Sequence, residues 1–248
     1  MLTSIVITKN EEQMIEDCLL SLKFCDEILV VDTGNTDKTN EIAKNCKAKI
    51  VSSSGKDYAK FRNDGLAAAK GDWVLYIDAD ERVTPLLRNE IKYKTKLEAA
   101  SAYAIPRQNI YLGKEMCYGG WSNDYVIRLF QKNKLKKWVH PLHEEPEYEG
   151  ALEKLENKIV HMSHRDLISM LNKTLEFTSF ESRLRLAANH PSIVAWRIVR
   201  IMCSEFWLRF IKLSAWRDGV EGIIDGMFQV FNSFVIYARL WEMQQIKK

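Results

Sequence analysis

The sequence has few cysteines, and none of them is placed for a disulfide framework or a zinc site. The five cysteines are an odd number, and no two of them have Cys-x-x-Cys spacing. Zinc sites and disulfide-stapled domains need such paired spacings. A chain of 248 residues, 46% of them hydrophobic, can bury a core without such cross-links. We therefore expect reduced cysteines that fill the core of a cytoplasmic protein.

Long apolar runs and an export signal are also lacking. The longest candidate, residues 226–238, is interrupted by Gln229, Asn232 and Ser233, whereas a spanning helix needs roughly 20 apolar residues. Residues 1–4 show no basic segment, apolar stretch or cleavage site. The formal net charge is only +3, so the overall charge favours no class of partner.

Short β-branched runs alternate with helical periodicity over the first ~80 residues. The runs predict strands at 4–8, 28–31, 49–51 and 73–77, with helices between them. This alternation predicts a mostly parallel sheet flanked by helices, the α/β class. Further strands are expected at 102–105 and 126–130, and only helical periodicity follows residue 165.

These patterns divide the chain into two expected parts. Residues 1–165 would form the α/β domain, with a first half of about 1–85 and a second half of about 86–165. Residues 166–248 would form an α-helical C-terminal extension.

Polar residues stand where three of the four predicted strands end: Thr8, Asp32 and Asp78. In α/β sheets, ligands bind beyond the carboxyl ends of the strands. Asp78 and Asp80 could present two carboxylates to one hard cation, Mg²⁺ or Mn²⁺. The alternative is a solvated acidic turn before the helix that would follow Thr84 and Pro85.

Asp32 and Arg62 supply a context for the two carboxylates. A carboxylate such as Asp32 can accept the ring N–H of a pyrimidine base, and a guanidinium such as Arg62 can hold a diphosphate. The alternatives are a turn-forming aspartate and a solvated helix residue.

The first 85 residues contain five motif segments, 5–12, 30–37, 61–63, 70–75 and 78–82. In this order, the segments resemble the motifs of the inverting family 2 glycosyltransferases of the GT-A fold. The resemblance implies that Thr8, Glu11, Asp32, Arg62 and Asp78 bind a nucleotide-sugar donor and that Asp80 binds the metal.

An inverting transfer also needs a base for the acceptor hydroxyl. Glu144 is the candidate base, with Glu145 in reserve, and His143 could complete the metal shell or contact the diphosphate. The alternative is a surface turn before Pro146. A second histidine, His140, leaves the alignment of this motif open.

Within the family, the sequence looks like the heptose β-glucosyltransferases of the bacterial lipopolysaccharide core. Segments 126–130, 143–144, 159–161, 216–222 and 237–242 carry this looser likeness. It implies glucose transfer from UDP-glucose to an inner-core heptose. The acceptor would be lipid-linked, so the enzyme would work peripherally at the inner face of the cytoplasmic membrane. We interpret His161 and His164 as structural or acceptor-side residues.

The helical extension contains a basic and aromatic stretch. Between 183 and 217 seven residues are basic and only Glu205 is acidic, with five Trp or Phe interleaved. Such a stretch suits an anionic membrane surface, and equally a helical hairpin packed on the first domain. No nucleic-acid-binding motif accompanies it.

Two other classes of function remain open. A metal-dependent nucleotidyltransferase also pairs aspartates at strand ends, but it usually has a glycine-rich basic loop where this chain has Thr8 to Glu12. A non-catalytic sugar-nucleotide-binding module would not need Asp78, Asp80 and Glu144.

Overall fold

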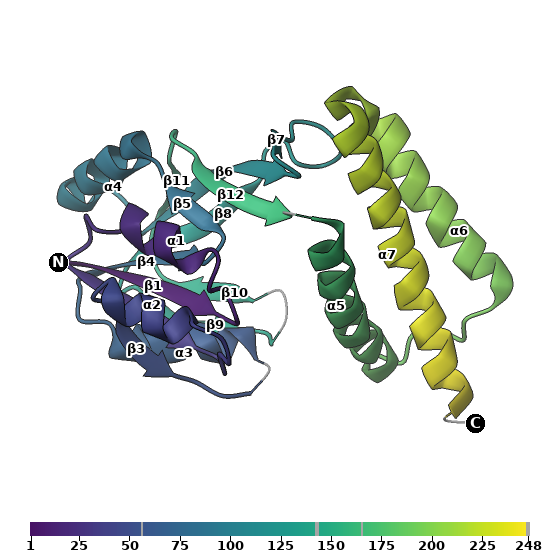
Figure 1. Cartoon of the computed structure of the whole chain (residues 1–248), viewed down its shortest axis with the longest axis horizontal. Coiled ribbons are helices and arrows are strands. Elements are labelled where there is room, and N and C mark those ends of the chain that lie inside the picture. The colour runs from purple at the N-terminus through teal and green to yellow at the C-terminus, as the bar shows by residue number, and fades with distance from the viewer. Residues whose placement is uncertain (56, 142–143, 165, 247–248) are drawn as a thin grey trace. The chain divides into compact units, whose positions relative to one another are not determined.

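The computed structural model describes residues 1–248 except 56, 142–143, 165 and 247–248. The described chain forms two compact units (Figure 1). The first contains Met1–Gln108 and Asp124–His161, and the second contains Asn109–Asn123 and Met162–Lys248. The strands β6 (Ala102–Tyr111) and β12 (Ile159–His164) begin in the first unit and end in the second.

The first unit is an α/β domain. Its other elements are β1 (Leu2–Thr8), α1 (Ile15–Ser21), β2 (Glu27–Asp32), α2 (Thr39–Asn45), β3 (Lys49–Ser52), α3 (Tyr58–Ala68), β4 (Trp73–Asp78), β5 (Glu81–Val83), α4 (Pro85–Leu97), β8 (Tyr125–Gln131), β9 (Leu135–Val139), β10 (Glu145–Tyr148) and β11 (Leu152–Lys154). All six strands expected from the sequence are present, with boundaries shifted by a few residues.

The main sheet has the order β3-β2-β1-β4-β8-β6-β12-β5. The strands β3, β2, β1 and β4 run parallel, whereas β8 pairs antiparallel with both β4 and β6. The expected fold class is therefore confirmed, and the parallel part is the part whose alternation is visible in the sequence. The strands β9 and β10 form a separate antiparallel pair.

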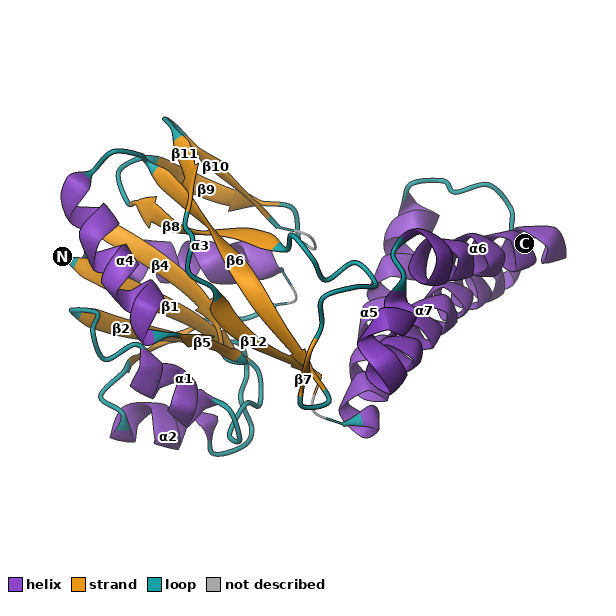
Figure 2. Cartoon of the chain, turned by 90° about the horizontal axis from the view of Figure 1, so that it is seen from above, coloured by secondary structure: helices purple, strands orange, loops and turns teal. Residues whose placement is uncertain are grey.

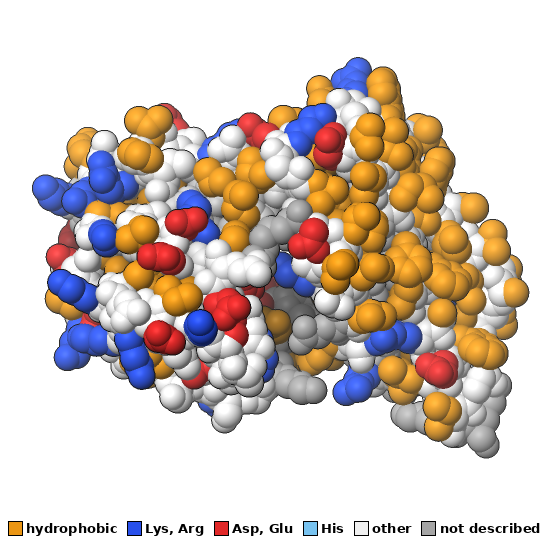
Figure 3. Space-filling model, in the orientation of Figure 1, with side chains coloured by type: hydrophobic (Ala, Val, Ile, Leu, Met, Phe, Trp, Pro, Cys, Tyr) orange, Lys and Arg blue, Asp and Glu red, His pale blue; other side chains and the backbone are white. Residues whose placement is uncertain are grey.

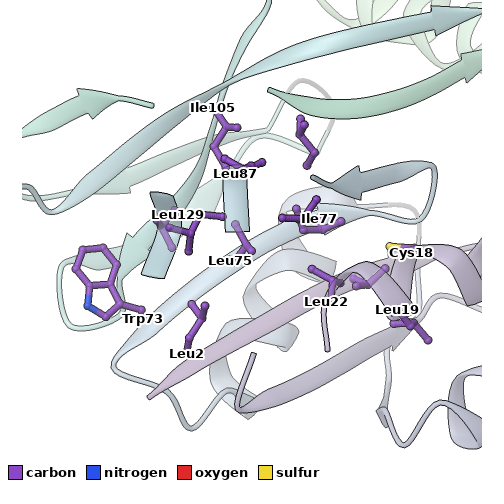
Figure 4. Close-up of a cluster of buried hydrophobic side chains, with 14 of the residues drawn as sticks. Leu2, Cys18, Leu19, Leu22, Trp73, Leu75, Ile77, Leu87, Ile105 and Leu129 are labelled. Atoms are coloured by element: carbon purple, nitrogen blue, oxygen red, sulfur yellow. The ribbon is translucent and has the colours of Figure 1, made fainter. Parts of the chain in front are cut away.

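Both faces of the sheet are covered (Figure 2). Along β4, Trp73, Leu75 and Ile77 point into one hydrophobic cluster, and Val74 and Tyr76 point into another. The first cluster includes residues of α1 and α4, some of them labelled in Figure 4, and Ala43 of α2. The second cluster includes residues of α3 and β9. A strand buried on both faces explains why 73–77 is a continuous apolar run.

The second unit consists of β7 (Lys114–Glu115), α5 (Leu167–Ala187), α6 (Ala195–Phe206), a π-helical turn η1 (Trp207–Lys212), a 3-10 turn η2 (Ala215–Asp218) and α7 (Gly219–Ile246). Two buried carboxylates tie the segment 109–123 to these helices. Asp218 accepts hydrogen bonds from the backbone N–H groups of Cys117 and Tyr118 at 3.0 and 2.7 Å, and Asp225 accepts one from the Trp121 indole at 2.8 Å.

Within the described residues, no helix is long and apolar enough to cross a membrane.

Gly65 allows α3 to lie close to the sheet. A Cβ at this position would come within 2.5 Å of Ile5 Cγ2 and 3.1 Å of Val31 Cγ2. Both neighbours are buried β-branched side chains, so neither can move away easily.

We predict that Gly65→Ala lowers the free energy of unfolding by about 1–3 kcal/mol because of overpacking. Helix propensity alone predicts the opposite, a gain of about 1 kcal/mol. Urea unfolding of the variant decides between the two. Ala67→Gly, at an exposed position of the same helix, measures the propensity of this helix without the crowding. A more stable Gly65→Ala protein would show that α3 has room to shift.

Candidate active site

The carboxyl ends of β1, β2 and β4 meet at one edge of the sheet. In the parallel register Thr8 lies beside Asp32, and Ile7 lies beside Asp78. Thr8 is buried, whereas Asp32 and Asp78 are partly exposed at this edge. The topology thus brings together three of the residues that the sequence analysis singled out, where α/β sheets bind ligands.

Asp32 organises the turn that follows β2. One carboxylate oxygen accepts the N–H groups of Gly34 and Asn35 at 2.8 and 2.7 Å, and the other accepts the side-chain amide of Asn40 at 2.7 Å. Burial alone would raise the pKa of Asp32, but these donors outweigh it and lower the pKa. Asp32 is therefore a turn-forming residue. An ionised carboxylate offers about four acceptor positions, so it can still receive a ligand N–H.

Hydrogen bonds connect the loop after β1 to the turn after β2. Asn10 has a left-handed backbone, with φ 55°, and its N–H donates to the Asn35 side chain at 2.7 Å. The Asn10 side chain in turn accepts the N–H of Thr36 at 2.8 Å. The N–H of Glu11 donates to the Thr39 hydroxyl at 2.8 Å. The sequence predicts that Glu11 binds the nucleotide-sugar donor. These hydrogen bonds hold Glu11 in a fixed loop beside the Asp32 turn.

Arg62 is a buried cation, not the solvated helix residue that the sequence also allowed. The residue is only 4% exposed. Its Nε and Nη2 lie 2.8 and 2.7 Å from the Oε1 of Glu144, and Nη2 lies 3.4 Å from Asp78 Oδ1. The guanidinium carbon also lies 4.8 Å from the ring centre of Trp138 and 5.6 Å from that of Tyr76. Carboxylates and aromatic rings together compensate the buried charge.

Arg128, from β8, is the second buried cation of this cluster, and residue-level reasoning from the sequence did not single it out. Its Nη2 donates to Asp78 Oδ2 and lies 3.9 Å from the Oε1 of Glu81. Glu81 is fully buried and accepts the backbone N–H of Asp78 at 2.9 Å. Arg107 lies 3.7 Å from Glu81 and also pairs with Asp124.

The two arginines fix the charge of Asp78. Burial alone would raise the pKa of Asp78, but the charges of Arg128 and Arg62 outweigh it and hold the pKa well below its usual range. Glu81 shows the opposite balance: burial and the nearby Asp78 raise its pKa despite Arg128. Asp78 is thus the permanent anion between the two arginines.

Asp80 lies beside a histidine from a distant strand. The Oδ2 of Asp80 is 3.7 Å from the Nε2 of His161, with side-chain exposures of 18% and 14%. The antiparallel register of β5 and β12 places His161 opposite Glu81 and therefore next to Asp80. An oxygen and an imidazole nitrogen form a donor set that Mn²⁺ accepts. Within the described residues, no group of three His, Cys, Asp or Glu is arranged to hold a metal.

The remaining predicted residues are distributed as follows. His143 lies outside the described residues. Glu145 is exposed and pairs with Val139 in the register of β10 and β9. His140 is also exposed, and its backbone is left-handed with φ 68°. His164 belongs to the second unit, where its ring lies edge-on to Tyr111 with 5.3 Å between ring centres.

Comparison with known proteins identifies the family. The model of the family described as "Glycosyl transferase family 2" matches residues 3–146. The chain belongs to this family. An α/β glycosyltransferase with the GT-A-like arrangement is therefore confirmed. Family membership favours glycosyl transfer over nucleotidyl transfer and over a non-catalytic role.

Relatives of this glycosyltransferase include proteins of similar length. The chain is 27% identical to an uncharacterized glycosyltransferase of Rickettsia typhi, over 98% of this chain and 87% of that protein. It is 21% identical to the lipopolysaccharide core biosynthesis glycosyltransferase LpsC of Rhizobium meliloti, over 99% of this chain and 94% of that protein.

Two solved structures are also similar to parts or all of the glycosyltransferase. Mycobacterium tuberculosis glucosyl-3-phosphoglycerate synthase, crystallised with Mn²⁺, UDP and glucosyl-3-phosphoglycerate, is 25% identical over 45% of this chain and 44% of that chain, with a TM-score of 0.38. TarS of S. aureus is 13% identical over 100% of this chain and 92% of that chain, with a TM-score of 0.47.

Replacing Asp78 by Asn tests the charge cluster of the glycosyltransferase. At neutral pH we expect the free energy of unfolding to fall by about 1–3 kcal/mol, because Arg62 and Arg128 lose an anionic partner. The pKa of Asp78 is lower in the folded protein than in the unfolded chain, where it is about 3.9. The ionised carboxylate therefore contributes its full stabilisation above about pH 3.9, and this stabilisation is lost as the pH falls through the pKa of the folded protein.

Urea unfolding over a series of pH values measures this difference. The gap between wild type and Asp78→Asn should be constant near neutral pH and should narrow below about pH 4. Asp17→Asn, at an exposed position in the first turn of α1, is the control and should open a smaller gap, at most about 1 kcal/mol, because it removes only a charge near the helix N-terminus. A gap that persists undiminished in acid would mean that the substitution acts through packing, not through charge.

Proposed function

We propose that this glycosyltransferase transfers a hexose, with glucose the first candidate, from a UDP-sugar to a sugar hydroxyl of the lipopolysaccharide inner core, with inversion. The observation that carries the proposal is the gathering of Asp32, Arg62, Asp78, Asp80 and Glu144 in one unit, in a chain of family 2. The likeness to LpsC supports a core saccharide as acceptor. Another lipid-linked or capsular glycan is the alternative.

The nucleotide would lie across the carboxyl edge of the parallel strands. In this proposal Asp32 accepts the N–H of the uracil ring, and Thr8 and Glu11 line the same edge. Asp78 holds Arg62 where the guanidinium can approach the diphosphate. The fixed loops after β1 and β2 support this role, because a preorganised site loses less entropy when ligand binds.

Mg²⁺ or Mn²⁺ would be held by Asp80 and by His161, whose Nε2 is 3.7 Å from that carboxylate. We propose His161 as the described imidazole partner of Asp80, in place of the structural or acceptor-side role expected from the sequence. His143, the sequence-based candidate, lies outside the described residues. With two protein donors, most of the coordination would come from the diphosphate and from water. The ion would stabilise the negative charge of the departing UDP.

Glu144 is proposed as the base. The acceptor oxygen would form a bond to the anomeric carbon, the bond from that carbon to UDP would break, and UDP would leave with the electron pair. The hydroxyl proton would pass to Glu144. Arg62 contacts Glu144 through two nitrogens, at 2.8 and 2.7 Å, and these contacts orient the carboxylate.

A lipid-linked acceptor would place the enzyme in the cytoplasm, peripherally at the inner face of the cytoplasmic membrane. The UDP-sugar and the transfer reaction would then remain in the aqueous phase, and only the acceptor would be anchored in the bilayer.

Thermal unfolding with nucleotide sugars tests the donor and the metal. We expect UDP-glucose with Mn²⁺ to raise the melting temperature more than either does alone, because only the folded protein binds them together. Asp80→Asn should abolish the Mn²⁺-dependent part, and His161→Gln should reduce it. The exposed Asp17→Asn protein is the control. If GDP-mannose stabilises and the UDP-sugars do not, the proposed donor is wrong.

A matched pair of variants tests the base. Glu144→Gln keeps an acceptor for Arg62 but cannot take a proton, so we expect transfer to fall by about 10²- to 10⁴-fold with donor binding retained. Glu145→Gln, one residue away and exposed, should transfer at nearly the wild-type rate. The measurement is release of UDP in the presence of deacylated core oligosaccharide. The reverse result, with Glu145→Gln inactive, would move the base to Glu145.

A further inference from the structure

The helix α6 presents its apolar stripe to the outside. The exposed fractions are 57% for Trp196, 61% for Val199, 46% for Phe206, 57% for Trp207 and 60% for Ile211. These positions recur at helical spacing along α6 and η1, so they share one face. Figure 3 shows how widely hydrophobic side chains cover the surface of the second unit. Contiguous exposed apolar surface in a soluble domain marks a binding surface.

The opposite face of α6 already supplies the core of the unit. Ile198 and Ile201 pack against a cluster that contains Ile236 and Leu240 of α7. The Phe210 ring of η1 lies so close to Gly226 that a Cβ there would come within 2.8 Å of it. The outward stripe is therefore additional to the residues that hold α6 and η1 on α7.

The charge around the stripe is basic. Residues 195–217 contain five basic residues and one acid, Glu205. Arg209 pairs with Glu205 at 2.7 Å and also donates to the carbonyl of Gly119. Arg200 of α6 and Lys212 of η1 are exposed. The outward face thus presents positive charge beside its aromatic rings.

Arginines and tryptophans adjoin each other on α6 and on the turn η2 that follows η1. The guanidinium carbons of Arg197 and Arg200 lie 5.5 and 5.3 Å from the ring centre of Trp196, and that of Arg217 lies 5.5 Å from the ring centre of Trp216. A ring with an apolar body and a polar N–H beside a cation matches the boundary between lipid headgroups and acyl chains.

We propose that the outward face of α6 and η1 binds an anionic phospholipid surface, with Trp196, Val199, Phe206, Trp207 and Ile211 entering the headgroup boundary and Arg200 and Lys212 contacting lipid phosphates. A second copy of the chain fits this face less well, because self-association would bring like charges together. The helix would lie in the plane of the surface, consistent with the finding that no described helix can cross a membrane. The proposal is independent of the donor and of the acceptor.

Co-sedimentation of the full chain with lipid vesicles tests the proposal. We expect binding to vesicles of phosphatidylglycerol and phosphatidylcholine, little binding to phosphatidylcholine alone, and weaker binding at high salt. Trp196→Ser combined with Trp207→Ser should lower the partition coefficient about ten-fold or more. The control combines Leu86→Ser and Tyr93→Ser on α4, which are 67% and 62% exposed, and should bind as wild type does.

A second pair of variants isolates the charge. Arg200→Glu with Lys212→Glu should reduce binding to anionic vesicles by at least about 25-fold, since each basic residue near such a surface contributes about five-fold. Arg88→Glu with Lys96→Glu, exposed on α4, changes the net charge equally and should leave binding nearly unchanged. If both pairs of variants lost vesicle binding equally, net charge alone would explain the binding, and the assignment of the membrane surface to α6 would be overturned.

Light scattering in solution decides the remaining alternative. A wild-type dimer that becomes monomeric in the double tryptophan variant, together with vesicle binding that does not change, would make the stripe a homodimer interface and contradict the proposal. Circular dichroism of every variant confirms that the helices are retained. UDP-glucose stabilisation should persist in all of them, so loss of vesicle binding cannot be confused with failure of the donor site.

Discussion

The first unit of the protein depends on one constraint: two buried guanidinium groups meet at the carboxyl end of β4. Arg62 and Arg128 are 4% and 6% exposed, and both contact Asp78. A buried charge without a partner is strongly destabilising, so each arginine requires an anionic partner. Asp78 is the partner that both arginines share, and Glu144 is a second partner of Arg62. Arg62 comes from α3, Arg128 from β8 and Asp78 from β4. Satisfying these charges fixes three elements at the place where the parallel sheet ends.

Such a cluster is poorly explained by stability alone. Replacing a buried ion group by apolar residues of similar volume is often neutral or stabilising. The edge around β4 is otherwise well supplied with apolar partners, since Tyr76 and Trp138 pack against Arg62. We therefore interpret the charges as retained for ligand binding, in keeping with strongly shifted pKa values at functional sites.

The sequence predicts the parallel half of the fold and its ligand edge better than it predicts the partners at that edge. The strands at 4–8, 28–31 and 73–77 are recognisable because burial on both faces makes them continuous apolar runs. Their parallel order then places Thr8, Asp32 and Asp78 side by side. Arg128 and His161 lie 50 and 83 residues after Asp78 in the chain. They reach the site through antiparallel pairings whose register no local pattern encodes.

Charge balance within the cluster gives a reason for the proposed metal. Arg62 and Arg128 are already matched by two anionic partners, Asp78 and Glu144. These pairings leave the buried cluster with little surplus positive charge. A sugar-nucleotide diphosphate would bring about two negative charges into this neutral setting, where unbalanced charge is costly. A divalent cation on Asp80 would supply the missing positive charge, and it would do so beside the bond that breaks.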